Sequence, residues 1–181
     1  MMAAVALICM TMTSVTLLSC GDDDDDKGKG NDGSKFTTAV LDFTFITSDE
    51  TLTALDVIAE YYDANGKLQS EKLTQSTFKK TVKANLPAYL GARMLFKVKS
   101  GIDAATLGKV NITYGYEYSV WCENAKGEMT GYNGKDNMRH ATLSGDKLGD
   151  KLENWASENS GLIKLAFDYT ADAKIVDSGW K

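Results

Sequence analysis

The residues best suited to bind a ligand are Trp121 and two glutamates of the same segment. Residues 110–123 alternate in character, and a strand with this pattern would present Glu117, Trp121 and Glu123 on one face. An exposed indole can stack on a sugar ring, and flanking carboxylates can accept hydrogen bonds from sugar hydroxyls. The pattern therefore predicts a glycan platform, unless a helix that carries Trp155 covers the indole.

The tyrosines of this segment would lie on the opposite face of the predicted strand. Tyr114, Tyr116 and Tyr118 could form an exposed stacking stripe, but they share a face with Val120 and Cys122. We therefore expect them to lie in the core, with their hydroxyls at its edge. Cys122 is then expected to be a small buried side chain and not a nucleophile.

Residues for catalysis or metal binding are scarce. His140 is the only histidine, in a stretch predicted to be a polar loop, and no nucleophile elbow or phosphate-binding loop occurs. The segment DANG at 63–66 resembles the start of a calcium loop but lacks the later ligands, so we interpret it as a turn. We expect a protein that is not an enzyme, with no catalytic residue, no metal and no cofactor.

Alternating apolar and polar residues indicate strands along most of the chain after residue 35. The segments are 36–45, 53–62, 78–82, 94–98, 110–123, 128–133, 163–169 and 175–176. Turn residues at 63–67 and 124–127 lie between alternating segments, which predicts two hairpins.

One helix is expected near the C-terminal end. Leu148, Leu152 and Trp155 recur at helical spacing, and Ser144 is the expected N-cap. Residues 36–181 are therefore predicted to form a mainly β domain. We expect an antiparallel, immunoglobulin-like β-sandwich of seven to eight strands with one short helix near the C-terminus.

Residues 1–19 have the character of a signal peptide. Residues 3–18 are apolar, and Leu17-Leu18-Ser19-Cys20 resembles the bacterial lipobox, although no Lys or Arg precedes the apolar residues. The resemblance implies cleavage after residue 19 and acylation of Cys20. The protein would then be anchored to a membrane through the lipid on Cys20.

An acidic, glycine-containing segment follows Cys20. Residues 22–26 are five consecutive Asp, so residues 20–35 are expected to be a disordered tether behind the lipidated Cys. The run resembles the export signal of Bacteroidetes surface lipoproteins, which implies display on the outer surface of the outer membrane. The alternative is a solubilising tether that faces the periplasm.

The charge distribution argues against nucleic acid as a partner. The formal net charge is −5, and residues 21–35 contribute six Asp against three Lys. The remaining domain is almost balanced and has no cluster of Lys and Arg.

Three segments of the domain support a resemblance: YYDANGKLQSEKL, TFKKTVKANLPAYLGA and NITYGYEYSVWCENAKGE. Together with the lipobox and the Asp run, they resemble the small surface lipoproteins with immunoglobulin-like domains of gut Bacteroidetes. The resemblance covers most of the chain after Cys20 and implies binding or adhesion at the cell surface. Cys20 is the one functional residue that it carries over.

Two functions are therefore considered. The first is a non-catalytic surface module that binds glycan or host protein, with Trp121, Glu117 and Glu123 as ligand-binding residues. The second is a structural accessory subunit that docks onto another outer-membrane protein. Exposed aromatic residues flanked by carboxylates would favour the first, whereas a contiguous apolar patch or an unpaired sheet edge would favour the second.

Overall fold

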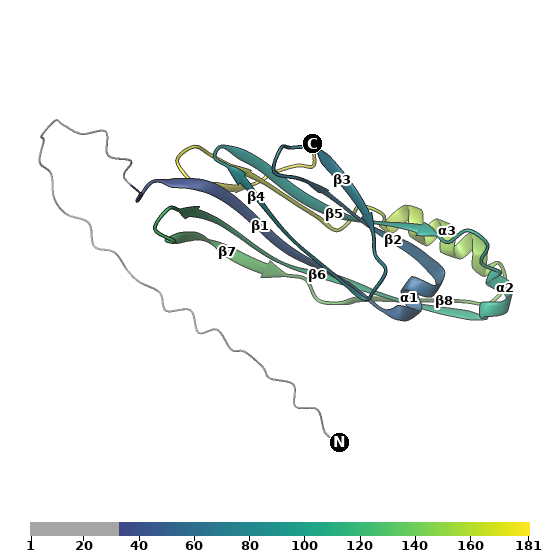
Figure 1. Cartoon of the computed structure of the whole chain (residues 1–181). Helices are drawn as coiled ribbons and strands as arrows, with labels where there is room; N and C mark the ends of the chain where they lie inside the picture. Colours follow the sequence, from purple (N-terminus) through teal and green to yellow (C-terminus); the bar gives the residue numbers. More distant parts are fainter. Residues whose placement is uncertain (1–32) are drawn as a thin grey trace, which may run out of the picture. The chain divides into compact units, whose positions relative to one another are not determined.

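The computed structural model describes residues 33–181, which form two antiparallel sheets and short helices (Figure 1). In chain order the elements are β1 (Phe36–Thr47), α1 (Asp49–Ala54), β2 (Leu55–Tyr62), β3 (Leu68–Lys72), β4 (Thr77–Asn85), β5 (Ala88–Val98), α2 (Ala104–Leu107), β6 (Lys109–Asn124), β7 (Met129–Lys135), β8 (Arg139–Ser144), α3 (Leu148–Asn159), β9 (Lys164–Tyr169) and β10 (Ile175–Asp177). The predicted signal peptide, Cys20 and most of the predicted tether lie outside the described residues.

Each sheet has five strands. Sheet A has the order β4-β1-β6-β7, and β8 also pairs with β6. Sheet B has the order β10-β9-β5-β2-β3. The predicted mainly β, antiparallel sandwich is confirmed, with ten strands among the described residues where seven to eight were predicted. Its immunoglobulin-like character stays a prediction.

The length of β6 explains how sheet A accommodates β8. Residues 117–123 of β6 pair with β7, and residues 109–114 pair with β8 on the same side. The β7 and β8 strands are therefore successive pieces of one edge.

The core lies between the sheets. The inward residues of β1 are fully buried, and the Phe43 ring lies 5.9 Å from the ring of Tyr61 in sheet B. Tyr169 of sheet B donates a hydrogen bond of 2.7 Å to the carbonyl of Val40 in sheet A. Burial of each large apolar side chain contributes roughly 1.5–3 kcal/mol, so alternation along the strands supplies most of the driving force for the sandwich.

Both predicted hairpins are present. In the β2–β3 turn, Asp63 accepts hydrogen bonds from the backbone N–H groups of Asn65 and Lys67, and Gly66 has a φ of +72°. In the β6–β7 turn, the side chain of Asn124 likewise accepts hydrogen bonds from the backbone N–H groups of Lys126 and Glu128. Asp63 therefore stabilises a turn, as predicted.

Two predictions about where the helices begin were wrong. Residues 53–62 do not form one strand, because α1 occupies Asp49–Ala54 before β2 starts; Ser48 caps this helix by accepting the N–H of Thr51. The apolar face of α3 is confirmed by buried Leu148 and Leu152, but Ser144 ends β8 and does not cap the helix.

Candidate functional site

The outer face of sheet A presents aligned cross-strand rows of side chains from β4, β1, β6 and β7. The rows are Lys79, Thr44, Glu117 and Lys135; then Thr81, Asp42, Ser119 and Asn133; then Lys83, Val40, Trp121 and Gly131; then Asn85, Thr38, Glu123 and Met129. Successive rows lie about 7 Å apart along the strands. The three predicted ligand-binding residues therefore share one face, and the neighbouring strands bring further polar groups beside them.

The first two rows enclose a hollow of about 530 Å³ that is open to solvent. Its lining residues are Asp42, Thr44, Lys79, Glu117, Tyr118, Ser119, Asn133, Gly134 and Lys135. A volume of this size suits a small organic ligand. Glu117, predicted from the sequence, thus lies in the hollow.

Two of the four charged side chains in the hollow have partners within the described part of the protein, and two do not. Lys79 Nζ lies 3.6 Å from Asp42 Oδ1, and Thr81 donates a hydrogen bond of 2.9 Å to the other oxygen of Asp42. Glu117 and Lys135 are cross-strand neighbours. Within residues 33–181, neither of their side chains makes a hydrogen bond or ion pair, so both can bind a ligand.

Trp121 lies beside the hollow and is half-buried. Its Nε1 donates a hydrogen bond of 3.2 Å to Glu123 Oε2, and Lys83 Nζ donates one of 2.7 Å to Glu123 Oε1. The hydrogen bond from Lys83, with a smaller contribution from Trp121, holds the pKa of Glu123 below its usual range. Glu123 is therefore ionised and orients the indole, whereas Glu117 is the glutamate with free oxygens.

No side chain stands opposite Trp121 on β7, because that position is Gly131. A Cβ on Gly131 would lie 2.0 Å from the carbonyl oxygen of Val120 and 2.5 Å from the Cα of Trp121, so the two strands approach too closely for a larger residue. Gly131 is exposed. The side of the indole toward β7 is therefore left open.

Helix α3 does not pack on Trp121. Its Trp155 ring lies 5.0 Å from Phe96 and 5.5 Å from Tyr114, and the helix contacts β5 and β8. Trp121 belongs to the other half of β6, which pairs with β7. The alternative in which this helix covers Trp121 is wrong, because the helix lies over the half of β6 that pairs with β8.

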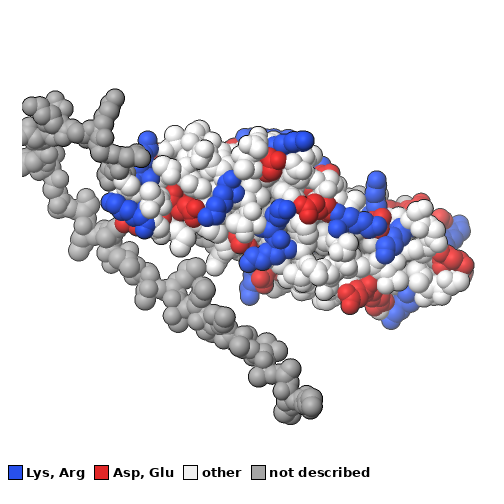
Figure 2. Space-filling view, in the orientation of Figure 1, with Lys and Arg blue, Asp and Glu red and all other residues white. Residues whose placement is uncertain are grey.

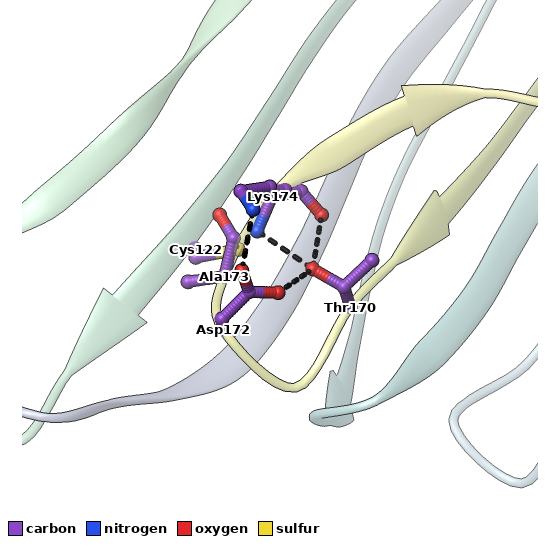
Figure 3. A network of polar contacts seen from close by, with 5 residues as sticks. All are labelled: Cys122, Thr170, Asp172, Ala173 and Lys174. Carbon is purple, nitrogen blue, oxygen red and sulfur yellow. Dashed lines mark hydrogen bonds and ion pairs between the residues drawn. The ribbon is translucent and has the colours of Figure 1, made fainter.

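The inward face of β6 is part of the core, as predicted. Tyr114 is buried, and Tyr118 is half-buried with its ring 5.4 Å from Phe167. The thiol of Cys122 is buried beneath the β9–β10 turn and donates a hydrogen bond of 3.6 Å to the carbonyl of Ala173 (Figure 3). Burial raises the pKa of Cys122, so the thiol stays neutral and inaccessible.

The β9–β10 turn that covers Cys122 is held by polar contacts. Thr170 donates a hydrogen bond of 2.6 Å to Asp172, and Lys174 Nζ lies 2.8 Å from the same carboxylate (Figure 3). These interactions close the turn on itself, and the Ala173 carbonyl of the turn is the group that accepts the hydrogen bond from the thiol. The prediction that Cys122 is a small buried side chain is confirmed.

The predicted polar loop around His140 is wrong. Residues Arg139–Ser144 form β8, and His140 is exposed with its Nδ1 3.0 Å from the hydroxyl of Thr113. Among residues 33–181, no group of three or more His, Cys, Asp or Glu side chains is placed to hold a metal ion.

Sequence reasoning missed the residues that other strands contribute to the hollow. Asp42 and Lys79 come from β1 and β4, and Asn133 and Lys135 come from β7. Alternation within each strand indicates which residues point outward. It does not indicate which outward residues of different strands become neighbours.

Positive and negative side chains are intermingled on the face of the molecule seen in Figure 2. The hollow follows the same pattern, with two Lys and two carboxylates. No family model, curated protein or solved structure matches this chain.

Proposed function

We propose that this chain is a non-catalytic, glycan-binding lipoprotein displayed at the surface of the outer membrane. The observation that carries the proposal is the open hollow on sheet A, whose free donors and acceptors lie beside a half-buried indole. Carbohydrate recognition needs this combination, since sugar rings have an apolar face and a rim of hydroxyls.

The geometry suggests how the ligand would lie. One sugar ring stacks on Trp121 from the open side beside Gly131, and the next occupies the hollow along the strands. There, hydroxyls donate to Glu117 and Asp42 and accept from Asn133 and the lysines. Because the hollow contains equal numbers of ammonium and carboxylate groups, the ligand is a neutral, hydroxyl-rich oligosaccharide.

Binding to arrays of neutral glycans and to mucin tests this proposal. Trp121→Ala should lower affinity at least tenfold, because the stacking surface is lost. Glu117→Gln keeps the size of the side chain and removes its charge, so it should lower affinity by a smaller factor. Calorimetric titration of the best glycan measures both effects.

Trp180→Ala is the matched control, because Trp180 also lies on an outer face of the sandwich but packs on sheet B. It should leave glycan affinity unchanged in protein that remains folded. Equal losses in Trp121→Ala and Trp180→Ala, or no binding to any glycan by the wild-type chain, would contradict the proposal.

The cellular location of the protein is a separate part of the proposal. It rests on the lipobox at Cys20 and on the Asp run. Among residues 33–181, no helix is both long and apolar enough to cross a membrane. Labelling with a radioactive fatty acid should fail for Cys20→Ala. Protease treatment of intact cells should remove the wild-type domain if it faces outward, and should leave it intact if it faces the periplasm.

Docking onto another outer-membrane protein is the second candidate, and it is favoured by the outer side of β7, with which no strand pairs within residues 33–181. Exposed large apolar side chains are otherwise dispersed over β3, β7, the α3–β9 loop and β10: Leu68, Met129, Tyr132, Leu162 and Val176. Capture of a specific outer-membrane protein by crosslinking on cells, with no glycan binding, would favour this candidate.

A further inference from the structure

The hollow on sheet A has a different neighbour at each of its two ends along the strands. At one end, beyond Ser119 of β6, the next row of the outer face contains Trp121. At the other end, beyond Glu117, the next row consists of Thr77, Ile46 and Gly115, from β4, β1 and β6. No residue of this last row lines the hollow, so the hollow ends between Glu117 and Gly115.

Gly115 carries no side chain, and the side chain of Met138 lies in the space that one would occupy. A Cβ on Gly115 would lie 2.6 Å from Sδ of Met138 and 3.7 Å from its Cε. Gly115 has the outward parity of Glu117 and Trp121, yet it is buried. The thioether of Met138 therefore lies on the outer face of sheet A, in the row next to Glu117.

The connection between β7 and β8 explains how Met138 reaches this position. The β7 strand pairs with β6 as far as Lys135, and β8 resumes the pairing at Arg139. Residues 136–138 therefore stand beside residues 115–116 of β6, and this extra residue on the edge makes a β-bulge. A bulge changes the direction of a side chain, and here it places Met138 across the outer face.

The same connection is held by polar contacts. The N–H of Asp136 donates a hydrogen bond of 3.0 Å to the carbonyl of Tyr116. Arg139 Nε donates one of 2.9 Å to Asp136 Oδ2. Met138 is therefore part of a segment that is fixed to β6 and forms a permanent barrier at this end of the hollow.

Ile46 extends this barrier onto β1. It is the cross-strand neighbour of Gly115 and is half-buried. An isoleucine side chain makes no hydrogen bonds, and a thioether is only a weak acceptor. A sugar ring above Ile46 and Met138 would lose water from its hydroxyls without gaining hydrogen bonds in return. A glycan in the hollow is therefore kept from continuing beyond Glu117.

The opposite end of the hollow is open. Gly131 is exposed and places no side chain beside the indole of Trp121. The indole itself can stack on a sugar ring. A glycan can therefore leave the hollow in this direction and gain a contact as it does so.

We propose that the hollow receives the terminal sugar of a neutral glycan, with Met138 and Ile46 closing the hollow behind it and the rest of the glycan leaving over Trp121. This inference rests on the glycan binding proposed above and names the part of the glycan that is recognised. An internal segment would have to cross Met138 to pass through the hollow. Since the two ends of a linear glycan are chemically different, each glycan chain offers one binding site, whatever its length.

The stoichiometry of binding as a function of glycan length tests this inference. The full protein, in detergent, is titrated calorimetrically with linear fragments of increasing length, prepared from the neutral glycan that binds best on the arrays. The wild type should bind as one protein per glycan chain at every length. Recognition of internal segments would instead make the number of bound proteins rise with glycan length.

The proposed function and this inference fail in different ways. A number of bound proteins that rises with glycan length in the wild type overturns the inference and leaves glycan binding in place. The absence of binding to any glycan overturns both.

Removal of the barrier gives a second measurement. Met138→Ala should open the hollow above Gly115, so that in folded protein the number of proteins bound per long glycan rises above one and increases with glycan length. Met138→Leu is the matched control, because leucine has a similar volume and keeps the barrier, so it should bind as one protein per glycan chain. Equal stoichiometry in the two folded variants would overturn the role of Met138. The wild-type series depends on neither variant.

Discussion

Two tryptophans lie on the outer faces of the sandwich, and each is close to a glycine. On sheet B, Gly91 is buried, and a Cβ there would lie 3.3 Å from the Trp180 ring. On sheet A, Gly131 is exposed beside Trp121. The chain therefore covers the first glycine itself and leaves the second open.

The cover on sheet B is the C-terminal segment, residues 178–181. The N–H of Ser178 donates a hydrogen bond of 2.8 Å to the carbonyl of Ala166. The guanidinium of Arg93 lies 4.5 Å from the centre of the Trp180 ring, and the Tyr62 ring lies 5.1 Å from it. These contacts use the aromatic and charged groups of sheet B for stability. On sheet A, Lys83 and Glu123 are paired in the same way, but no residue of β7 covers the indole of Trp121.

The largest expected loss of folding stability follows substitution of the two glycines. Gly131→Ala would push a Cβ into the backbone of β6, with the nearest atom at 2.0 Å, and should cost about 3 kcal/mol of folding stability. Gly91→Ala meets its nearest atom at 2.9 Å and should cost about 1–2 kcal/mol. Denaturant unfolding measures both, and the reverse order would show that the close contact of β6 and β7 is misplaced.

The second largest effect is a difference in folding stability between variants of the two tryptophans. Trp180→Ala removes contacts with Tyr62 and Arg93 and should cost about 2 kcal/mol, less than for a fully buried tryptophan. Trp121→Ala should cost about 1 kcal/mol or less, because its outer side is uncovered. Thermal unfolding of the two variants under one condition tests the comparison, and equal costs would mean that Trp121 is structural.

A smaller difference is expected for the cations beside the tryptophans. Arg93→Met removes the contact with Trp180 and an ion pair of 2.6 Å with Glu60, and should cost about 1 kcal/mol. Lys83→Met removes the more exposed pair with Glu123 and should cost roughly 0.5 kcal/mol or less. The midpoint of urea unfolding measures both; a larger loss at Lys83 would contradict the comparison.

The smallest effect is a pH dependence of the C-terminal cover. Hydrogen bonds from Lys181 and Ser178 hold the pKa of Asp168 below its ordinary value of 3.8. A carboxyl whose pKa is lower in the folded state contributes stability above its unfolded pKa and loses that contribution as the pH falls through its folded pKa. The contacts of Ser178 and Lys181 should therefore loosen in acid.

Amide exchange of Ser178 tests this effect, because its N–H is bonded to sheet B. Its protection factor should fall below pH 3.8 in the wild type. In Asp168→Asn the protection should be lower at neutral pH and should change little with acid. A wild-type protection factor that does not change with acid would contradict the role of Asp168.

Local patterns in the sequence were enough for several features. Alternation along residues 110–123 predicted the common face of Glu117, Trp121 and Glu123 and the burial of Cys122. Turn residues predicted both hairpins, and helical spacing predicted the buried face of α3. These predictions succeed because they depend on the period of a single element or on a few adjacent residues.

The tertiary structure alone decided which outward residues became neighbours. Lys79, Asp42 and Lys135 join Glu117 only through the register of β1 with β4 and β6 and of β6 with β7. The covering of Gly91 by Trp180 is another contact between distant segments. A strand's own sequence determines which side of it is apolar, but pairing between strands far apart in the chain depends on how the whole core packs.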